Sequence, residues 1–323
     1  MLREDADLLG YTGQFTIYDD DDSKRMVRDI MQALGIEQKQ FPINMIRSKI
    51  SSAKNAMIGP EDMLKSADSP NDKKAAQVYM ELERRLRAAN AMDFDDLLVR
   101  TLELLRTRPE VLDKYQERFR YISVDEYQDT NEVQNRIFDA ISCKGENLFT
   151  VGDVKQSIYR FRLADPRIFL QHYNTWPPLE DAEEHDSAKL LLSRNFRSRK
   201  EVLDATNFIF CNILSEEMGE LDYGADEMLR LGANYVESSA CGAEFHLLDL
   251  PTQTGEQRVR ASEAEAAFVA DYISNMLTSE FPIQDDKTKE LRPVCEEDIV
   301  ILMRSPSTRL LDYRRALEAR GLH

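Results

Sequence analysis

Short apolar segments that end in acidic or glycine residues recur in the middle of the chain, and helical runs separate them. Residues 121–124 and 148–151 have the composition of buried strands, and we expect a third strand at 189–193. Helices are expected between them at 130–142 and 165–173. Strands that alternate with helices predict a parallel α/β sheet. Residues just past the strand ends then lie at the edge where such sheets bind ligands.

The flanking regions carry different patterns. Residues 1–90 place apolar side chains mostly at helical spacing, which predicts a helical region without strands. Further strands are expected at 244–250 and 298–303, where a second α/β unit begins. Its helices are expected at 201–214, 262–276 and 307–320.

Length and composition set broad limits. The 323 residues, 42% of them apolar, suffice for two or three domains with real cores. No apolar run is long enough to cross a bilayer, and the acidic first ten residues do not form a secretory signal. The 4 cysteines form no C-x-x-C pair, so we expect a cytoplasmic protein with reduced thiols. A net charge of −17 argues against a broad nucleic-acid coat but permits a narrow basic groove.

The first candidate site is the string Val-Asp-Glu-Tyr-Gln-Asp-Thr-Asn at residues 124–131. It presents Asp125 and Glu126 directly after a predicted strand. In nucleotide-hydrolysing α/β proteins, the acid at this place holds Mg²⁺, and the next acid can deprotonate the attacking water. The alternative is a solvated acidic turn that caps a helix. That alternative would suffice for two adjacent acids but explains the whole string poorly.

The second candidate site spans residues 151–162. Gly152 permits a sharp turn after the strand, and Gln156 is a neutral side chain suited to sensing a terminal phosphate. Aromatic and arginine side chains then alternate at Tyr159, Arg160, Phe161 and Arg162. This alternation suits base stacking and backbone contact with a single strand. Taken alone, a buried aromatic pair with surface arginines explains it equally well.

The third candidate site spans residues 191–198. Arg197 could neutralise charge that develops on a γ-phosphate, and Phe196 could lie against a purine. An ordinary junction between a strand and a helix is the better explanation for this segment alone.

Together and in this order, the three strings resemble the Walker B, GDxxQSIYxFR and NYRS-type motifs of superfamily 1 DNA helicases of the UvrD/Rep/PcrA kind. Segments 15–19, 50–55 and 92–97 also resemble family segments, so the likeness covers essentially the whole chain. Residues 163–166 (Leu-Ala-Asp-Pro) replace the usual Gly-Ala, and Phe196 stands where Tyr is commoner. These departures resemble the AddA-type helicase–nuclease subunit, whereas the compact helical region resembles the UvrD side.

The resemblance implies incomplete RecA-like P-loop NTPase motor domains, of α/β class, with an α-helical inserted subdomain. Residues 1–14 and 92–194 would belong to the first motor domain, 15–91 to the insertion, and 195–323 to the start of the second. The implied activity is that of an ATP-dependent 3′–5′ DNA helicase in repair or recombination. The implied ligands are ATP and Mg²⁺.

Residue roles at the nucleotide follow from the same resemblance. Asp125 would ligate Mg²⁺, and Glu126 would be the catalytic base. Gln156 would contact the γ-phosphate and couple it to DNA. Phe196 would stack near the adenine, and Arg197 would reach the γ-phosphate.

The resemblance also implies partners. Phe161, with Tyr159 and Arg162 nearby, would contact single-stranded DNA, including DNA at junctions with duplex. A nuclease subunit is a further implied partner, and no membrane is involved.

A phosphate-binding loop requires G-x-x-x-x-G-K-[ST], and none of the 12 glycines precedes a lysine. The family carries this loop upstream of the segment that resembles 15–19, so we expect a fragment that is catalytically incomplete alone. A non-catalytic DNA-binding or interaction module is the alternative, and a separate chain could supply the loop. Gln128 and the GDxxQS string argue against a superfamily 2 ATPase.

Overall fold

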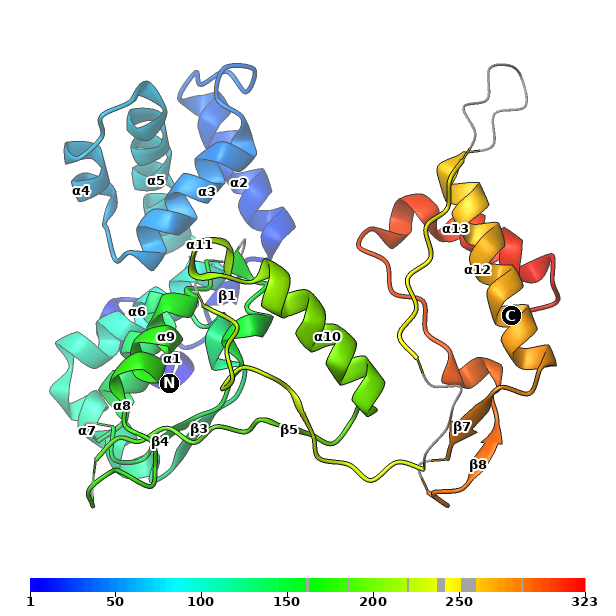
Figure 1. The fold of residues 1–323 in the computed structure, drawn as a ribbon. Helices are drawn as coiled ribbons and strands as arrows, with labels where there is room; N and C mark the ends of the chain where they lie inside the picture. Colours follow the sequence, from blue (N-terminus) through cyan, green and yellow to red (C-terminus); the bar gives the residue numbers. More distant parts are fainter. Residues whose placement is uncertain are drawn as a thin grey trace. The chain divides into compact units, whose positions relative to one another are not determined.

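The computed structural model describes residues 1–323 except 144, 161–162, 185, 220, 237–241, 251–259, 286 and 323. The chain divides into two compact units, Met1–Leu191 and Leu192–His323. Figure 1 labels the elements of both units.

The first unit is mostly helical and carries two small sheets. Its helices are α1 (Leu2–Asp5), α2 (Asp20–Ala33), α3 (Ile43–Asn55), α4 (Pro60–Lys65), α5 (Pro70–Ala88), α6 (Phe94–Thr107), α7 (Pro109–Arg118), α8 (Glu132–Ile141) and α9 (Pro166–Thr175). Its strands are β1 (Thr16–Ile17), β2 (Ala91–Met92), β3 (Ile122–Val124) and β4 (Leu148–Thr150). The expected strands at 121–124 and 148–151 and the helices at 130–142 and 165–173 are therefore confirmed.

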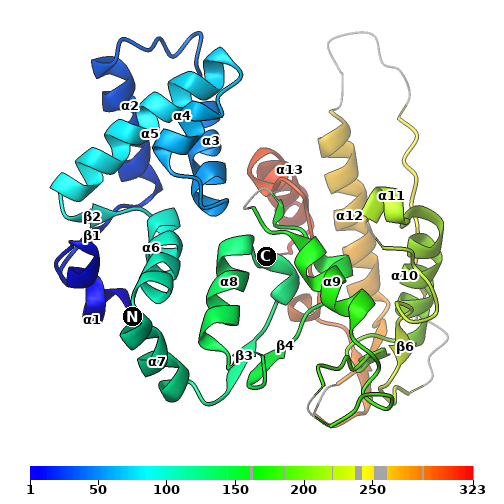
Figure 2. The same ribbon diagram turned by 90° about the vertical axis from the view of Figure 1, so that its left-hand side faces the viewer.

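Helices α2 to α5 gather round a core of their own. Asp19 caps α2, and a reciprocal capping box between Ser69 and Asp72 starts α5 at a proline. The buried side chains of this core include Val27, Ile30, Ile46, Val78 and Leu82. Figures 1 and 2 show these helices grouped together, with α6 between them and α7 and α8.

A second core joins α1, α6, α7 and α8. Its buried side chains include Leu2, Leu102, Leu105, Tyr115 and Val133. Beside it, β3 and β4 pair in parallel with Ile122 opposite Leu148 and Val124 opposite Thr150. Short strands β1 and β2 also pair in parallel, and β1 corrects the expectation that residues 1–90 contain no strand. Two-residue strands are too short to show an alternating pattern in sequence.

The second unit contains helices α10 (Lys200–Ile213), α11 (Glu216–Gly219), α12 (Ala261–Thr278) and α13 (Pro306–Glu318). Its strands are β5 (Arg194–Asn195), β6 (Arg230–Leu231), β7 (Pro282–Gln284) and β8 (Leu291–Pro293). Strands β5 and β6 pair in parallel, β7 and β8 pair antiparallel, and α12 packs against α13. The helices expected at 201–214, 262–276 and 307–320 are confirmed.

Three expected strands are wrong. Residues 244–250 and 298–303 form no strand in the described structure, and the third segment, 189–193, contributes only an isolated bridge from Lys189 to Pro178. A strand requires a hydrogen-bonding neighbour, and the apolar pattern of a segment cannot supply one. The apolar side chains of these segments are instead largely exposed, with Phe245 and Leu302 each 90% accessible.

Among the helices that the structure describes, none has both the length and the apolar character needed to cross a membrane.

Candidate functional site

The acidic string (residues 124–131) and the turn that begins at Gly152 lie side by side, because the strands that precede them, β3 and β4, are parallel neighbours. The carbonyl of Val124 accepts a hydrogen bond from the amide of Val151 at 2.8 Å. The amide of Tyr127 donates in turn to the carbonyl of Val151 at 2.9 Å. Both chains therefore turn at the same edge of the sheet, where parallel sheets present ligand-binding residues.

Gln128 joins the two turns through both ends of its amide. The buried side chain donates from Nε2 to Glu126 Oε2 at 2.6 Å, and its Oε1 accepts from the amide of Asp153 at 3.0 Å. A Cβ at position 152 would lie 2.5 Å from Gln128 Oε1, so only glycine permits this approach. The glutamine therefore fixes the orientation of the Glu126 carboxylate relative to the second turn.

The two acidic side chains that the sequence places at this site are both exposed. Asp125 Oδ1 accepts from the amide of Glu126 at 2.9 Å. Glu126 has φ of +52°, a left-handed conformation that is uncommon for non-glycine residues and frequent at functional sites. Burial, and secondarily the Glu126 carboxylate, raises the pKa of nearby Asp129. The carboxyl groups of Asp125, Glu126 and Asp129 therefore all follow directly on the end of β3.

The carboxylates fit a magnesium ion that arrives with a nucleotide. Mg²⁺ keeps several waters and uses one or two carboxylates together with substrate phosphates. Asp125 offers one exposed carboxylate of that kind. Among the described residues, no group of three or more His, Cys, Asp or Glu side chains could hold a metal without such help.

Gln156 lies on the same edge and is exposed. Its Nε2 donates to Asp153 Oδ2 at 2.9 Å, and Lys155 forms an ion pair with the other oxygen of Asp153 at 2.8 Å. The Asp153 carboxylate thus holds Gln156 close to the turn that Gln128 joins to Glu126. Tyr159 is also exposed, whereas the predicted DNA-contact residues Phe161 and Arg162 lie outside the described residues.

The third candidate site belongs to the second unit. Asn195 Oδ1 accepts from the amides of Arg197 and Ser198, at 2.9 and 2.8 Å, and so shapes the turn before α10. The Phe196 ring is exposed, and Gly232 lies against its edge, where a Cβ would approach to 2.8 Å. Arg197 is exposed as well. This turn therefore presents one aromatic face and one guanidinium to solvent.

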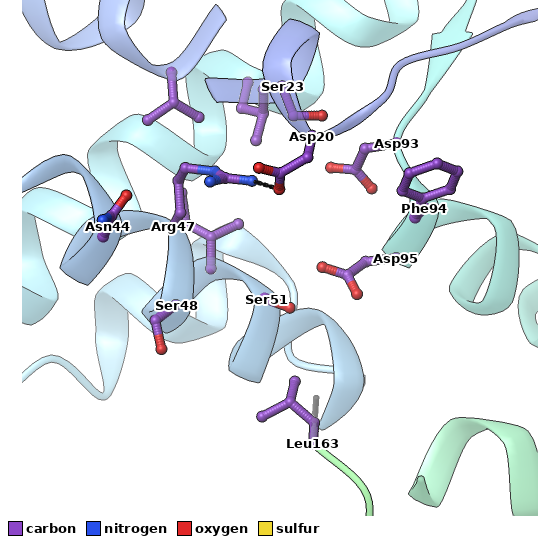
Figure 3. A pocket seen from close by; sticks show the side chains of 13 residues that line it. Asp20, Ser23, Asn44, Arg47, Ser48, Ser51, Asp93, Phe94, Asp95 and Leu163 are labelled. Carbon is purple, nitrogen blue, oxygen red and sulfur yellow. Dashed lines mark hydrogen bonds and ion pairs between the residues drawn. The ribbon is translucent and has the colours of Figure 1, made fainter. Parts of the chain in front are cut away.

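A cavity of about 760 Å³ opens between the helical group formed by α2 to α5 and the start of α6. Figure 3 shows Arg47 and Ser51 of α3 facing Phe94 and Asp95 of α6, with Leu163 at the lower edge. Arg47 forms an ion pair with Asp20 across the cavity wall. The Phe94 ring is 59% exposed. Leu163 follows directly on the predicted DNA-contact residues Phe161 and Arg162.

Sequence reasoning did not assign Phe94 or Gln128 a role. Segment 92–97 resembles a family segment, and an aromatic between acidic residues at a helix start is the available signal for Phe94. No signal in the sequence indicates that Gln128 bonds to two separate strings.

Comparison with known proteins gives a family match and a set of longer relatives. A family model described as the UvrD/REP helicase N-terminal domain matches residues 1–177. The chain is 39% identical over 263 residues to an ATP-dependent helicase/nuclease subunit from Listeria monocytogenes serotype 4b, covering 77% of this chain and 21% of that protein. The protein of the same name from Bacillus cytotoxicus is 41% identical over 252 residues, covering 72% and 20%. The chain thus spans about a fifth of the length of these relatives.

Proposed function

The chain belongs to the UvrD/REP helicase family, and from this premise we propose that it forms part of an ATP-dependent 3′–5′ DNA helicase. The proposed work is translocation along single-stranded DNA, coupled to ATP hydrolysis, which unwinds duplex during repair or recombination. We propose ATP as substrate and Mg²⁺ as its companion ion.

One observation carries the proposal. Gln128 bonds to Glu126 on one turn and to Asp153 on the next, so the proposed catalytic base and the turn that carries Gln156 form one hydrogen-bonded unit. In this unit Gln156 contacts the γ-phosphate, and a change at the phosphate reaches the chain that continues to Tyr159. That continuity is what a motor requires between its nucleotide and its DNA.

Glu126 acts as the general base. Its carboxylate is exposed and held by Gln128, so it can take the proton of an attacking water without losing its orientation. Asp125 would hold Mg²⁺, which supplies charge neutralisation at the phosphates when bound. In the second unit, Arg197 stabilises developing charge on the γ-phosphate, and Phe196 stacks near the adenine.

Single-stranded DNA is the proposed second ligand. Tyr159, Phe161 and Arg162 contact the strand, as the resemblance implies. The cavity beside Leu163 adds the exposed Phe94 ring as a stacking platform, whereas Arg47 in its wall is neutralised by Asp20. Local contacts of this kind suffice for single-strand binding, so DNA binding does not require the whole chain to be basic.

The domain limits are part of the proposal. We propose an insertion at 15–91, a first motor domain from 1–14 and 92–194, and a second motor domain from 195. The separate core of α2 to α5 supports the insertion, and the division at Leu191 supports the boundary between the motor domains.

A non-catalytic DNA-binding module remains the second candidate for these 323 residues alone. The observation that favours it is that none of the 12 glycines precedes a lysine, so no phosphate-binding loop is encoded here. We propose that hydrolysis requires a loop-bearing segment, in the same or another chain. The relatives are named as ATP-dependent helicase/nuclease subunits, and we infer an AddA-like subunit that works with a nuclease partner.

Binding of fluorescein-labelled oligothymidine to the chain, measured by anisotropy, tests the DNA part of the proposal. We expect salt-sensitive binding that Phe94→Ala weakens by about 1–3 kcal/mol, the usual contribution of one stacked base. Phe149→Ala is the matched control, because Phe149 is similarly exposed but does not line the cavity. Equal losses in both variants, or no binding by the wild-type chain, would contradict the proposed DNA site.

A further inference from the structure

Asn55, the last residue of α3, connects two parts of the first unit that have separate proposed roles. Its Oδ1 accepts a hydrogen bond from Asn131 Nδ2 at 2.9 Å, and its Nδ2 donates to Asp95 Oδ1 at 3.2 Å. The same Nδ2 also donates to the carbonyl of Ser51 at 2.9 Å. Asn55 and Asn131 are both more than nine-tenths buried, so their hydrogen bond is shielded from water.

One end of this connection lies at the cavity. Asp95 lines the cavity wall next to the exposed Phe94 ring, and it is only partly buried. The Asp95 carboxylate that accepts from Asn55 therefore also borders the space that a ligand in the cavity would occupy. A base or sugar that donates a hydrogen bond to this carboxylate competes with Asn55 for it.

The other end lies at the acidic string. Asn131 is the N-cap of α8, where its Oδ1 accepts from the amide of Gln134 and its own amide donates to Gln134 Oε1, both at 2.9 Å. The preceding Thr130 donates from its hydroxyl to the carbonyl of Tyr127 at 2.8 Å. The orientation of the Asn131 side chain therefore affects the junction between residues 124–131, which include Glu126, and the N-terminus of α8.

Lys54, the residue before Asn55, fixes the backbone at the end of α3. Lys54 is 1% exposed and donates to Asp93 Oδ2 and Asp96 Oδ1, both at 2.8 Å, which fixes the end of α3 on the start of α6. A change at the cavity can therefore move the Asn55 amide more easily than it can move the helices. A single amide between two rigid elements is a suitable carrier of coupling.

We propose that Asn55 is a positioning residue that links occupancy of the cavity to the geometry of the acidic string. The proposal rests on the proposed function, because it assigns the cavity to DNA and the string to hydrolysis. It adds a route through the helical group that does not pass through Gln156. A DNA strand in the cavity forms a hydrogen bond with the Asp95 carboxylate, and the Asn55 side chain changes its orientation in response. The hydrogen bond between Asn55 and Asn131 then shifts the N-terminus of α8, which follows the segment that contains Glu126.

The link is tested first without ligand, by hydrogen–deuterium exchange of the whole chain. The readout is the amides of Asn131 and Gln134, which the capping box protects. We expect Asn55→Ala to speed their exchange about three- to tenfold, and Asp95→Ala to speed it to a smaller extent. In the double variant, Asp95→Ala should add nothing to the effect of Asn55→Ala. Independent, additive effects, or no effect of Asp95→Ala on these amides, would overturn the link.

Controls separate the link from general loss of stability. Asn71→Ala removes an asparagine from the exposed surface of α5 and should leave both amides unchanged. If Asn55→Ala does not fold, Asn55→Ser keeps a polar group that is too short to reach both partners, and it is used in the same cycle.

A second arm adds oligothymidine and distinguishes the two proposals. Wild-type protein should change exchange at Asn131 and Gln134 on binding, and Asn55→Ala should bind without that change. Binding with no change in the wild type refutes the link and leaves the DNA site standing. Absence of binding refutes the DNA site, while the ligand-free cycle still decides whether Asn55 connects Asp95 to Asn131.

Discussion

Replacing Lys54 with methionine should destabilise the first unit severely. Lys54 Nζ lies 2.8 Å from Asp93 and from Asp96 and 3.4 Å from Glu83, and the ammonium is almost completely buried. Methionine keeps most of the volume and removes the charge, so three carboxylates lose their shared cation. Removing one partner of a buried ion pair costs about 3–5 kcal/mol, because the remaining charge is left uncompensated. That is a large part of the stability of an ordinary domain, about 5–15 kcal/mol.

The stability lost in Lys54→Met should increase as pH rises. Burial, opposed by Lys54 and aided by Asp93 and Glu83, raises the pKa of Asp96 to about 7. Because this folded-state pKa lies above the unfolded value of 3.8, the contribution of Asp96 to stability falls as pH rises from about 4 to about 7. Without Lys54 this pKa rises further. The loss in Lys54→Met should therefore be larger at pH 8 than at pH 5.

Urea unfolding followed by tryptophan fluorescence measures this loss. Trp176 is the single tryptophan, and its ring stacks on His172, with centroids 4.4 Å apart, inside the first unit. The control is Lys65→Met, because Lys65 pairs with Asp62 at 2.8 Å in solvent, where screening leaves such a pair little effect on stability. A Lys54→Met loss at pH 8 no larger than that of the control, or a loss that shrinks as pH rises, would refute the reasoning.

Two further predictions concern the turns of the site. Gly152→Ala places a Cβ 2.5 Å from Gln128 Oε1, so we expect the free energy of unfolding, measured in urea, to fall by about 1–3 kcal/mol. The control is Gly59→Ala, which has open space around it and should stay within about 1 kcal/mol of the wild type. Equal stability of the two variants would show that the turn at Gly152 accommodates the methyl group. Phe161→Ala should weaken oligothymidine binding by about 1–3 kcal/mol in the anisotropy assay, and an unchanged affinity would return Phe161 to a structural role.

Local structure was predictable from the sequence where the residues that determine it lie within one segment. Helices α5 and α8 begin at capping boxes that are visible as Ser69 with Asp72 and Asn131 with Gln134, and their apolar faces repeat at helical spacing. Strands β3 and β4 were predictable because each is a short apolar run before an acidic or glycine residue.

Features that depend on distant partners were not predictable in the same way. Segments 244–250 and 298–303 resemble strands in composition but have no pairing neighbour among the described residues. The bonds of Gln128 to both turns, and of Asn55 to Asp95 and Asn131, join residues up to 76 positions apart. Spacing along one sequence carries no information about such contacts.

ATP hydrolysis measured with and without single-stranded DNA tests the proposed motor most directly. We predict no turnover by the 323-residue chain, and DNA-stimulated turnover once a segment bearing G-x-x-x-x-G-K-[ST] from a UvrD/REP relative is joined upstream. In that extended protein, Glu126→Gln should abolish hydrolysis while ATP binding is retained. Hydrolysis that survives Glu126→Gln would contradict the assignment of the base, and DNA-stimulated hydrolysis by the chain alone would contradict the requirement for a separate phosphate-binding loop.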